Sequence, residues 1–402
     1  MITQYPTSPT EKLYRFYGRN PPVQCLGRLK AEQYVTRRGF FDNSDLIAKL
    51  RYEGEKDGSD VDVVSNFGGL LNWLYGSTDI NPLPPHYRCP KCKNTLFYCD
   101  GDGWDLPVLE CCGEPMIRDG HQIPIEVMAS MFENPDREMD IRIAKSFSDR
   151  AVEIIKHYFM KEFILTQCEY DNHSNNELVF ALIPIREALP ELDENGIWQT
   201  DIDELYHSNF RIIKLICADI REHLREFRHK TGLNPTIDDL LAEPVLAVTQ
   251  AKLITEIVEE GGTLLKADPP SFSSLLSVIG YLRSSQSEAN PIFTDPDGRY
   301  TDVFFCREDV WYMLTDTLKP EYGISLEFAK KVAANVRRGA YTRNRMDQDT
   351  EQVLRGIGIP DHWIKQMKET CFLRGKSELI IDLLERLAVS WFELQESSSA
   401  SK

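Results

Sequence analysis

Residues 138–143 read Glu-Met-Asp-Ile-Arg-Ile, a run in which charged and apolar side chains alternate. Because successive side chains of a β-strand point to opposite faces, this alternation predicts a strand with one polar and one apolar face. The polar and the apolar face each carry three residues: Glu138, Asp140 and Arg142, and Met139, Ile141 and Ile143. The apolar face is expected to cover a core, which leaves the charged groups on the other side for chemistry.

The segments around this strand predict an α+β fold. Residues 61–76 begin with β-branched side chains and continue through a glycine pair, which favours a strand, a tight loop and a helix. A helix is expected over 149–163 and a buried strand over 178–185. The run 211–220 fits a strand or a helix, and from about residue 235 onward the pattern is mostly helical.

A dense group of cysteines lies in residues 81–126, a segment rich in Pro and Gly that has no helical period. Cys89 and Cys92 form a Cys-Pro-Lys-Cys pair, and Cys111 and Cys112 stand side by side further along. A Cys-x-x-Cys turn directs two thiolates at one ion, and a second pair completes a tetrahedral zinc shell. The segment therefore predicts a zinc knuckle rather than disulfides.

The second cysteine pair is irregular. Adjacent residues of an extended chain point to opposite sides, so Cys111 and Cys112 need a kink to bind one ion. If one of them turns away, Cys99 is the alternative fourth ligand, and His121 is a more distant candidate. The competing hypothesis is a degraded knuckle without metal. A closed shell of thiolates has no open coordination position, so a bound zinc is expected to be structural.

Composition limits the partners of the chain. Its 63 acidic and 46 basic residues give a net charge of −17, which repels a phosphate backbone unless basic residues cluster on one face. One candidate cluster contains six residues of the C-terminal half: Lys330, Lys331, Arg337, Arg338, Arg343 and Arg345. No run approaches the length of a membrane helix and no apolar signal core is present, so a cytoplasmic protein is expected.

Several segments, in this order, resemble PolC-type bacterial DNA polymerase III alpha subunits. The most specific is NPLPPHYRCPKCKNTLFY at 81–98, followed by DLP, the cysteine pair, and IRDGHQIPIE at 117–126. Four further segments agree: DRAVEIIKHYF at 149–159, IIKL at 212–215, CREDV at 306–310 and GIPDHWIKQMKET at 358–370. The resemblance extends, with interruptions, over roughly residues 22–392.

The resemblance implies a nucleotidyltransferase palm of the polymerase-β type, in which three aspartates hold two metal ions. It implies a remnant of that palm with an inserted zinc knuckle and a helical C-terminal region. The expected parts are listed in chain order: a helical lead-in at 1–60, a palm-like domain at 61–230 with the knuckle at 81–126, a helical finger-like domain at 231–394, and a disordered tail at 395–402.

The aspartates of the family are mostly replaced in this chain. The first survives as Asp140, the second aligns with Arg142, and the third falls on Ile216. Asp219 lies three positions further on, which on a strand is the opposite face. A guanidinium repels Mg²⁺, so we do not expect a magnesium site. One alternative keeps catalysis, because Glu138 and Asp140 also lie two apart on one face.

The nucleotide-binding features of the family are also reduced. Gly68 and Gly69 stand where a glycine-serine loop cradles the triphosphate, but the serines are gone. The family's Gln-His-Pro-Gly-Gly motif has no counterpart, and Arg374 and Lys376 stand near its Pro-Lys-Ala-His motif. We therefore expect a non-catalytic polymerase relative that serves as a scaffold for DNA or a replication protein. The alternatives are a minimal DNA polymerase that uses Glu138 and Asp140, and a decayed replication gene of a mobile element.

Overall fold

The chain folds into two compact units in the computed structural model. The first unit comprises Met1–Asn81 and Met131–Asn234, and the second comprises Pro82–Ser130 and Pro235–Lys402. The structure describes residues 9–36, 44–63, 69–98, 101–125, 138–169, 176–201, 204–205, 208, 210–262, 264–284, 298–317 and 326–400.

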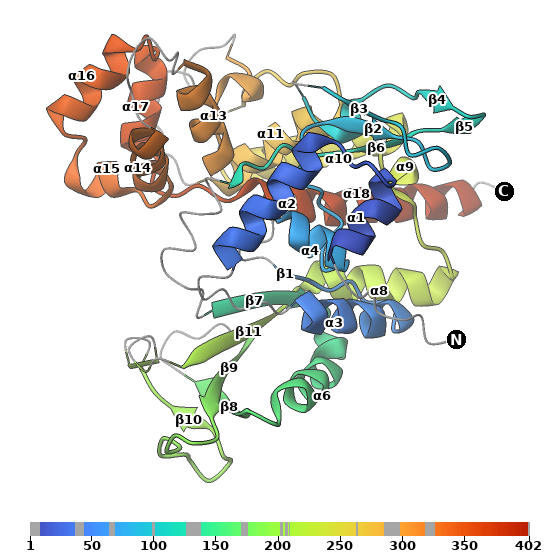
Figure 1. Ribbon diagram of the computed structural model, residues 1–402, viewed down its shortest axis with the longest axis vertical. Coiled ribbons are helices and arrows are strands. Elements are labelled where there is room, and N and C mark those ends of the chain that lie inside the picture. The colour runs from blue at the N-terminus through green and yellow to red at the C-terminus, as the bar shows by residue number, and fades with distance from the viewer. Residues whose placement is uncertain are drawn as a thin grey trace. The chain divides into compact units, whose positions relative to one another are not determined.

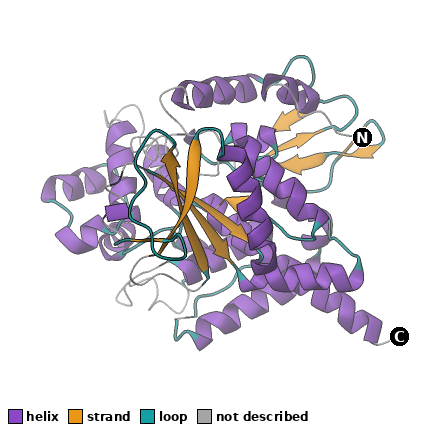
Figure 2. Cartoon of the chain, turned by 90° about the horizontal axis from the view of Figure 1, so that it is seen from below, coloured by secondary structure: helices purple, strands orange, loops and turns teal. Residues whose placement is uncertain are grey.

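A mixed sheet of six strands organises the first unit, in the order β1-β7-β11-β9-β8-β10 (Figures 1 and 2). Its strands are β1 Asp62–Val63, β7 Glu138–Ile143, β8 Phe163–Glu169, β9 Glu177–Pro184, β10 Trp198–Gln199 and β11 Arg211–Cys217. The helices of the unit are α1 Pro9–Tyr17, α2 Val23–Thr36, α3 Ser44–Lys56, α4 Leu70–Tyr75, α6 Ser148–Phe159 and α8 Asp219–Thr231. β7 pairs with β11 in parallel, whereas β1 and β9 run antiparallel to their neighbours.

The apolar face of β7 lies in the main core of this unit, as its alternation predicts. Met139, Ile141 and Ile143 are buried there together with the alternate residues of β11. Leucines and isoleucines of α3 and α6 belong to the same core, and these two helices lie together beside the sheet (Figure 1). The period of two therefore leaves Asp140 and Arg142 on the opposite face.

The neighbouring predictions are confirmed with shifted ends. The buried strand expected at 178–185 is β9, and the ambiguous run 211–220 is the strand β11 followed by α8. The helix expected at 149–163 is α6, which ends at Phe159 because the chain turns there and enters β8. β8 pairs with β9 along its length, so strand pairing replaces the last helical turn.

Arginines of α8 bind the acidic turn that leads into β1. Arg221 donates to Asp62 at 2.8 Å and to the carbonyl oxygen of Arg142 at 2.7 Å. One and two turns further along the helix, Arg225 and Arg228 pair with Asp57 and Asp60 respectively. The spacing of four and three residues places the three guanidiniums on one face of the helix. Arg221 is only 1% exposed, and among the residues that the structure describes it is the largest fully buried side chain.

The second unit combines short strands with most of the helices. Its strands form a sheet of order β3-β2-β6 and a hairpin β4-β5: β2 His86–Arg88, β3 Thr95–Phe97, β4 Glu110–Cys111, β5 Glu114–Pro115 and β6 Ile117–Asp119. Its helices are α9 Ile237–Leu240, α10 Glu243–Glu259, α11 Phe272–Arg283, α13 Arg307–Thr317, α14 Leu326–Arg337, α15 Ala340–Asn344, α16 Gln348–Gly356, α17 Asp361–Glu369 and α18 Lys376–Ala400. Among the helices that the structure describes, none is long and apolar enough to cross a membrane.

Two features of this division differ from the expected parts. The helices of the expected lead-in at 1–60 belong to the unit that contains the sheet. The cysteine segment at 81–126 belongs with the C-terminal helices instead of the palm-like part, because its polar side chains are bound by α11 and α18.

The expected disordered tail at 395–402 is wrong for residues 395–400, which continue α18. The apolar side of this helix stays buried as far as Phe392. Beyond it, the hydroxyls of Ser397, Ser398 and Ser399 each donate to the carbonyl oxygen four residues earlier. Serines bound in this way remain compatible with a helix. Residues 401–402 lie outside the described part.

Replacing Arg221 should destabilise the first unit strongly. Arg221→Ala leaves Asp62 without this buried partner, so we expect the free energy of unfolding to fall by about 3–5 kcal/mol in urea denaturation. Arg150→Ala removes an exposed arginine that also bridges two acids, and its effect should stay within about 1 kcal/mol. Equal effects of the two variants would contradict the role assigned to the buried pair.

Candidate functional site

Four cysteines predicted to bind a metal come together in the second unit. Cys89 and Cys92 lie in the turn between β2 and β3, and Cys111 and Cys112 lie at the hairpin of β4 and β5. Their sulfurs all lie within 4.8 Å of one another, with 3.7 Å between Cys92 and Cys111 and 3.8 Å between Cys111 and Cys112. Zinc–sulfur bonds of about 2.3 Å in a tetrahedron separate the sulfurs by about 3.8 Å. The group could therefore hold a metal ion such as zinc.

A left-handed turn solves the problem of the adjacent cysteines. Cys112 has φ 54° and Gly113 has φ 71°, and together they join β4 to β5, where Cys111 pairs with Glu114. Two successive residues with positive φ are typical of the type I′ hairpin turn. This turn is the kink that two adjacent cysteines need in order to bind one ion, and it brings both thiols close to those of Cys89 and Cys92.

Of the two other ligand candidates, only His121 lies in the described part of the chain. Cys99 lies outside the described residues, and the four thiols assemble without it. His121 is bound elsewhere, because its Nδ1 lies 3.0 Å from both carboxylate oxygens of Asp102. The described part of the chain thus supports a site of four cysteines that uses both Cys111 and Cys112.

The crowded thiols differ in acidity. The backbone N–H of Cys92 donates to the sulfur of Cys89 at 3.4 Å, and this bond, helped by the neighbouring thiols, lowers the pKa of Cys89 to about 6. Hydrogen bonds with Cys92 and Cys112 raise the pKa of Cys111 to about 12, and a hydrogen bond with Cys92 raises the pKa of Cys112, although its bond with Cys111 acts to lower it. Several negative charges cannot accumulate at one point without a cation, so the full set of thiolates requires a metal ion.

The polar face of β7 lies beside β11, the strand that carries the third aligned position, Ile216. Asp140 pairs across the strands with Lys214, and Arg142 pairs with Ile216. The positions of the two replaced aspartates are therefore direct neighbours. Asp219 begins α8 beyond the end of β11, and the backbone of its preceding residue already bonds to Ile143 at the end of β7.

The alternative carboxylate pair is only partly described. The backbone of Glu138 pairs with Ile212, but its side chain lies outside the described residues. Asp140 is the member of the pair that the structure places, and the residue opposite it is the cation Lys214. An ammonium group beside a carboxylate competes with a divalent ion for that carboxylate.

The glycine pair precedes a helix whose first amides are already bound. Gly68 lies outside the described residues, and Gly69 is the residue before the first turn of α4. The backbone N–H groups of Leu70 and Leu71 donate to the carboxylate of Glu32 at 2.8 and 2.9 Å. Glu32 is 3% exposed and is also held by Arg28. The carboxylate of Glu32 thus binds two of the backbone donors that a helix N-terminus can offer to an anion.

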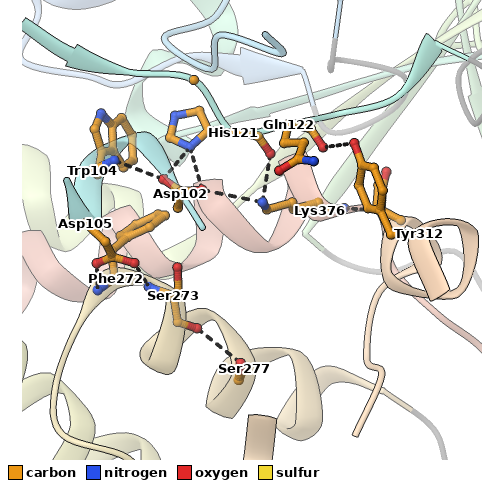
Figure 3. Close-up of polar contacts among 12 residues, drawn as sticks. Asp102, Trp104, Asp105, His121, Gln122, Phe272, Ser273, Ser277, Tyr312 and Lys376 are labelled. Atoms are coloured by element: carbon orange, nitrogen blue, oxygen red, sulfur yellow. Dashed lines mark hydrogen bonds and ion pairs between the residues drawn. The ribbon is translucent and has the colours of Figure 1, made fainter. Parts of the chain in front are cut away.

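Sequence analysis missed a buried polar network in the second unit (Figure 3). The carboxylate of Asp102 accepts hydrogen bonds from His121 Nδ1 and, at 3.1 Å, from the backbone N–H of Trp104. Lys376 Nζ lies 3.4 Å from the same carboxylate and donates to the carbonyl oxygen of His121 at 2.7 Å. Burial acts to raise the pKa of Asp102, but His121 and Lys376 hold it at about 2. Asp102 is therefore a buried anion with two cation-forming neighbours.

Two glycines allow the chain around Asp102 to approach the chain around His121 closely. The backbone N–H of Gly103 donates to the carbonyl oxygen of Gly120 at 2.7 Å. A Cβ on Gly103 would lie 2.0 Å from the carbonyl oxygen of Asp119, and Gly120 has φ 98°, a conformation that favours glycine. The Asp-Gly-His run could have indicated this turn, but its partner Lys376 lies too far along the chain for any sequence pattern to show.

Comparison with known proteins agrees with the resemblance found in the sequence. A relative from Thermotoga petrophila, named DNA polymerase III PolC-type, is 23% identical over 96% of this chain and 33% of its own length. Relatives of the same name from Thermotoga maritima and Clostridium perfringens are 22% and 24% identical, over 96% and 95% of this chain and 33% and 31% of their own. The chain thus spans about a third of the curated relatives it matches. No protein-family model matches it.

We predict one tightly bound zinc ion per chain. Cys92→Ser removes one of four ligands, so the purified variant should lose most of its zinc in elemental analysis. Cys371→Ser is the matched control, because Cys371 is exposed and lies outside the group. Cys99→Ser should also keep its zinc. Loss of zinc from Cys99→Ser with retention in Cys111→Ser would contradict the assignment.

Zinc affinity should rise with pH. Free Cys111 and Cys112 keep their protons at neutral pH because their pKa values are raised, so binding must release at least these two protons. Each released proton strengthens apparent affinity by about tenfold per pH unit. Chelator competition between pH 6.5 and 7.5 should show a gain of at least about a hundredfold. A flat profile would mean that these thiols do not ionise on binding.

Proposed function

We propose that this chain is a non-catalytic relative of PolC-type DNA polymerases that serves as a scaffold in DNA replication and binds DNA or a replication protein. Relatives named DNA polymerase III PolC-type match it over almost the whole of its length. In this proposal the six-stranded sheet is a polymerase-β-like palm remnant, the four cysteines hold structural zinc, and the protein works in the cytoplasm, where the DNA is.

The replaced metal-binding positions carry this proposal. A two-metal palm needs carboxylates that converge on one face, because each ion must be neutralised and both must be held about 4 Å apart. Arg142 and Ile216, which align with two of the three aspartates, are cross-strand partners on one face of the sheet. If both positions once held metal-binding aspartates, they should lie side by side on one face, as Arg142 and Ile216 do. Their adjacency therefore supports the proposal that the carboxylates were lost from a palm site. One placed carboxylate, Asp140, remains.

The nucleotide side of the site supports the same view. The backbone amides of Leu70 and Leu71 are bound by Glu32, so two donors at the helix start near the glycine pair are already taken and do not serve a triphosphate. We therefore propose that magnesium and nucleotides are not bound there. The minimal polymerase that uses Glu138 and Asp140 is the alternative, and Lys214 opposite Asp140 disfavours it.

The basic cluster supports binding of DNA. Lys330, Lys331 and Arg337 lie on α14, and the others follow it as far as Arg345. In the part of the chain that the structure describes, the six side chains of the cluster form no ion pair with a carboxylate. The paired arginines of α8 differ in this respect, since each of them contacts a carboxylate directly. Cations without a carboxylate partner attract a phosphate backbone.

The protein should not extend a primer on a template with Mg²⁺ or Mn²⁺. The double variant Arg142→Asp with Ile216→Asp puts two carboxylates beside Asp140, so Mn²⁺ binding measured by titration should strengthen. Synthesis should nevertheless stay near zero, because the nucleotide-binding features are still missing. Gel-based primer extension and Mn²⁺ titration measure the two effects separately.

Asp140→Ala is the control for the enzyme alternative. Primer extension by the unmodified protein that disappears in Asp140→Ala would overturn the non-catalytic proposal. Fluorescence anisotropy with a primer-template tests the scaffold half. Binding that weakens in Arg338→Ala with Lys331→Ala favours DNA as the partner, whereas no binding at any salt concentration would leave a replication protein as the partner to test.

A further inference from the structure

The cysteine segment is tied to the C-terminal helices by residues other than its cysteines. Asp105 accepts hydrogen bonds from the backbone N–H groups of Phe272 and Ser273, at 2.7 and 2.8 Å, at the start of α11 (Figure 3). Lys376, the first residue of α18, binds Asp102 and His121. The Tyr312 hydroxyl of α13 donates to the carbonyl oxygen of the residue after His121 at 2.7 Å. The segment therefore belongs to the core of its unit.

These ties lie between and just after the metal ligands in the chain. Asp102 and Asp105 stand in the loop that begins after Cys92 and ends at Cys111. An ion bound by the four cysteines holds both ends of this loop, while α11 and α18 hold its middle. Metal binding reduces the conformational entropy of the loop, so less entropy is lost when the loop then docks on the helices. Docking in the same way lowers the entropy cost of metal binding, and each is expected to favour the other.

We propose that metal binding at the four cysteines is thermodynamically coupled to docking of residues 102–122 on α11 and α18. Lys376 then acts as a positioning residue for an ion that it does not touch. The inference rests on the zinc site of the proposed function and is independent of DNA binding. In this proposal the ion helps to order α11 and α18, although neither helix supplies one of its ligands.

Burial makes the tie at Lys376 strong enough to carry this coupling. The side chain of Lys376 is 15% exposed and that of Asp102 is 1% exposed. His121 is fully buried against Trp104, with ring centroids 4.2 Å apart. Removing the ammonium group leaves Asp102 a buried anion with His121 as its one remaining cation-forming neighbour, so the docked state becomes less favourable. By reciprocity, docking strengthens metal binding by the same factor by which metal binding favours docking, so a variant that spends more of its time undocked should bind the metal more weakly, by at most that factor.

Zinc affinity of Lys376→Met tests the coupling. In competition with a chromogenic chelator, this variant of the full chain should bind zinc about tenfold more weakly, still with one ion per chain. Lys376→Arg keeps a cation and donors near Asp102 and should recover most of the affinity. Lys365→Met is the matched control, because its amine makes a partly exposed ion pair with Glu369 on the same helix, α17, and its zinc affinity should not change.

A second variant and a second measurement guard against misfolding. Asp105→Ala cuts the tie to α11 at an exposed carboxylate and should weaken zinc binding by about threefold, within the range of coupling energies. Hydrogen exchange of the wild type should show that chelation speeds exchange at the start of α11 and α18 but not in α16. Unchanged affinity in folded Lys376→Met and Asp105→Ala, or no change in exchange on chelation, would overturn the coupling. Loss of zinc from the wild type itself would instead reject the metal site.

Discussion

The two-residue period of β7 is the constraint on which the first unit depends. This strand lies inside the sheet, between β1 and β11, so both of its faces have fixed surroundings. Met139 and Ile141 can enter the core only if Asp140 and Arg142 take the other face, and a slip of one residue would bury the charges. The parallel pairing with β11 then sets Lys214 and Ile216 beside them. The composition of the polar face, with one placed carboxylate and two cations, follows from that register.

Arginine has two contrasting uses in this unit. Arg221 is buried and compensated, since it binds both Asp62 and a backbone carbonyl oxygen, and its companions on α8 fasten the acidic turn before β1. Arg142 stands on the polar face, where its charge opposes binding of a divalent cation. The same kind of side chain therefore stabilises the sheet in one place and argues against two-metal chemistry in the other.

In the second unit, backbone geometry makes the thiol group and a buried carboxylate ties it to the helices. The left-handed Cys112 turns two adjacent thiols to one point, which an extended chain cannot do. Asp102 joins His121 to Lys376 across a wide separation in sequence. Together they make the cysteine segment part of the helical unit, so a structural ion there would stabilise more than a small knuckle.

The sequence by itself determined the local features. The alternation of residues 138–143 determined the strand and its two faces, the Cys-Pro-Lys-Cys pair indicated a metal site, and the knuckle segment pointed to PolC-type relatives. These signals are local because they depend on spacing along a strand or within a turn. Only the tertiary structure decided that the adjacent Cys111 and Cys112 both come close to the first pair, where the segment docks, and that Glu32 occupies the helix start near Gly69. Those outcomes depend on contacts between residues far apart in the chain, and the period of a single segment carries no information about its distant partners.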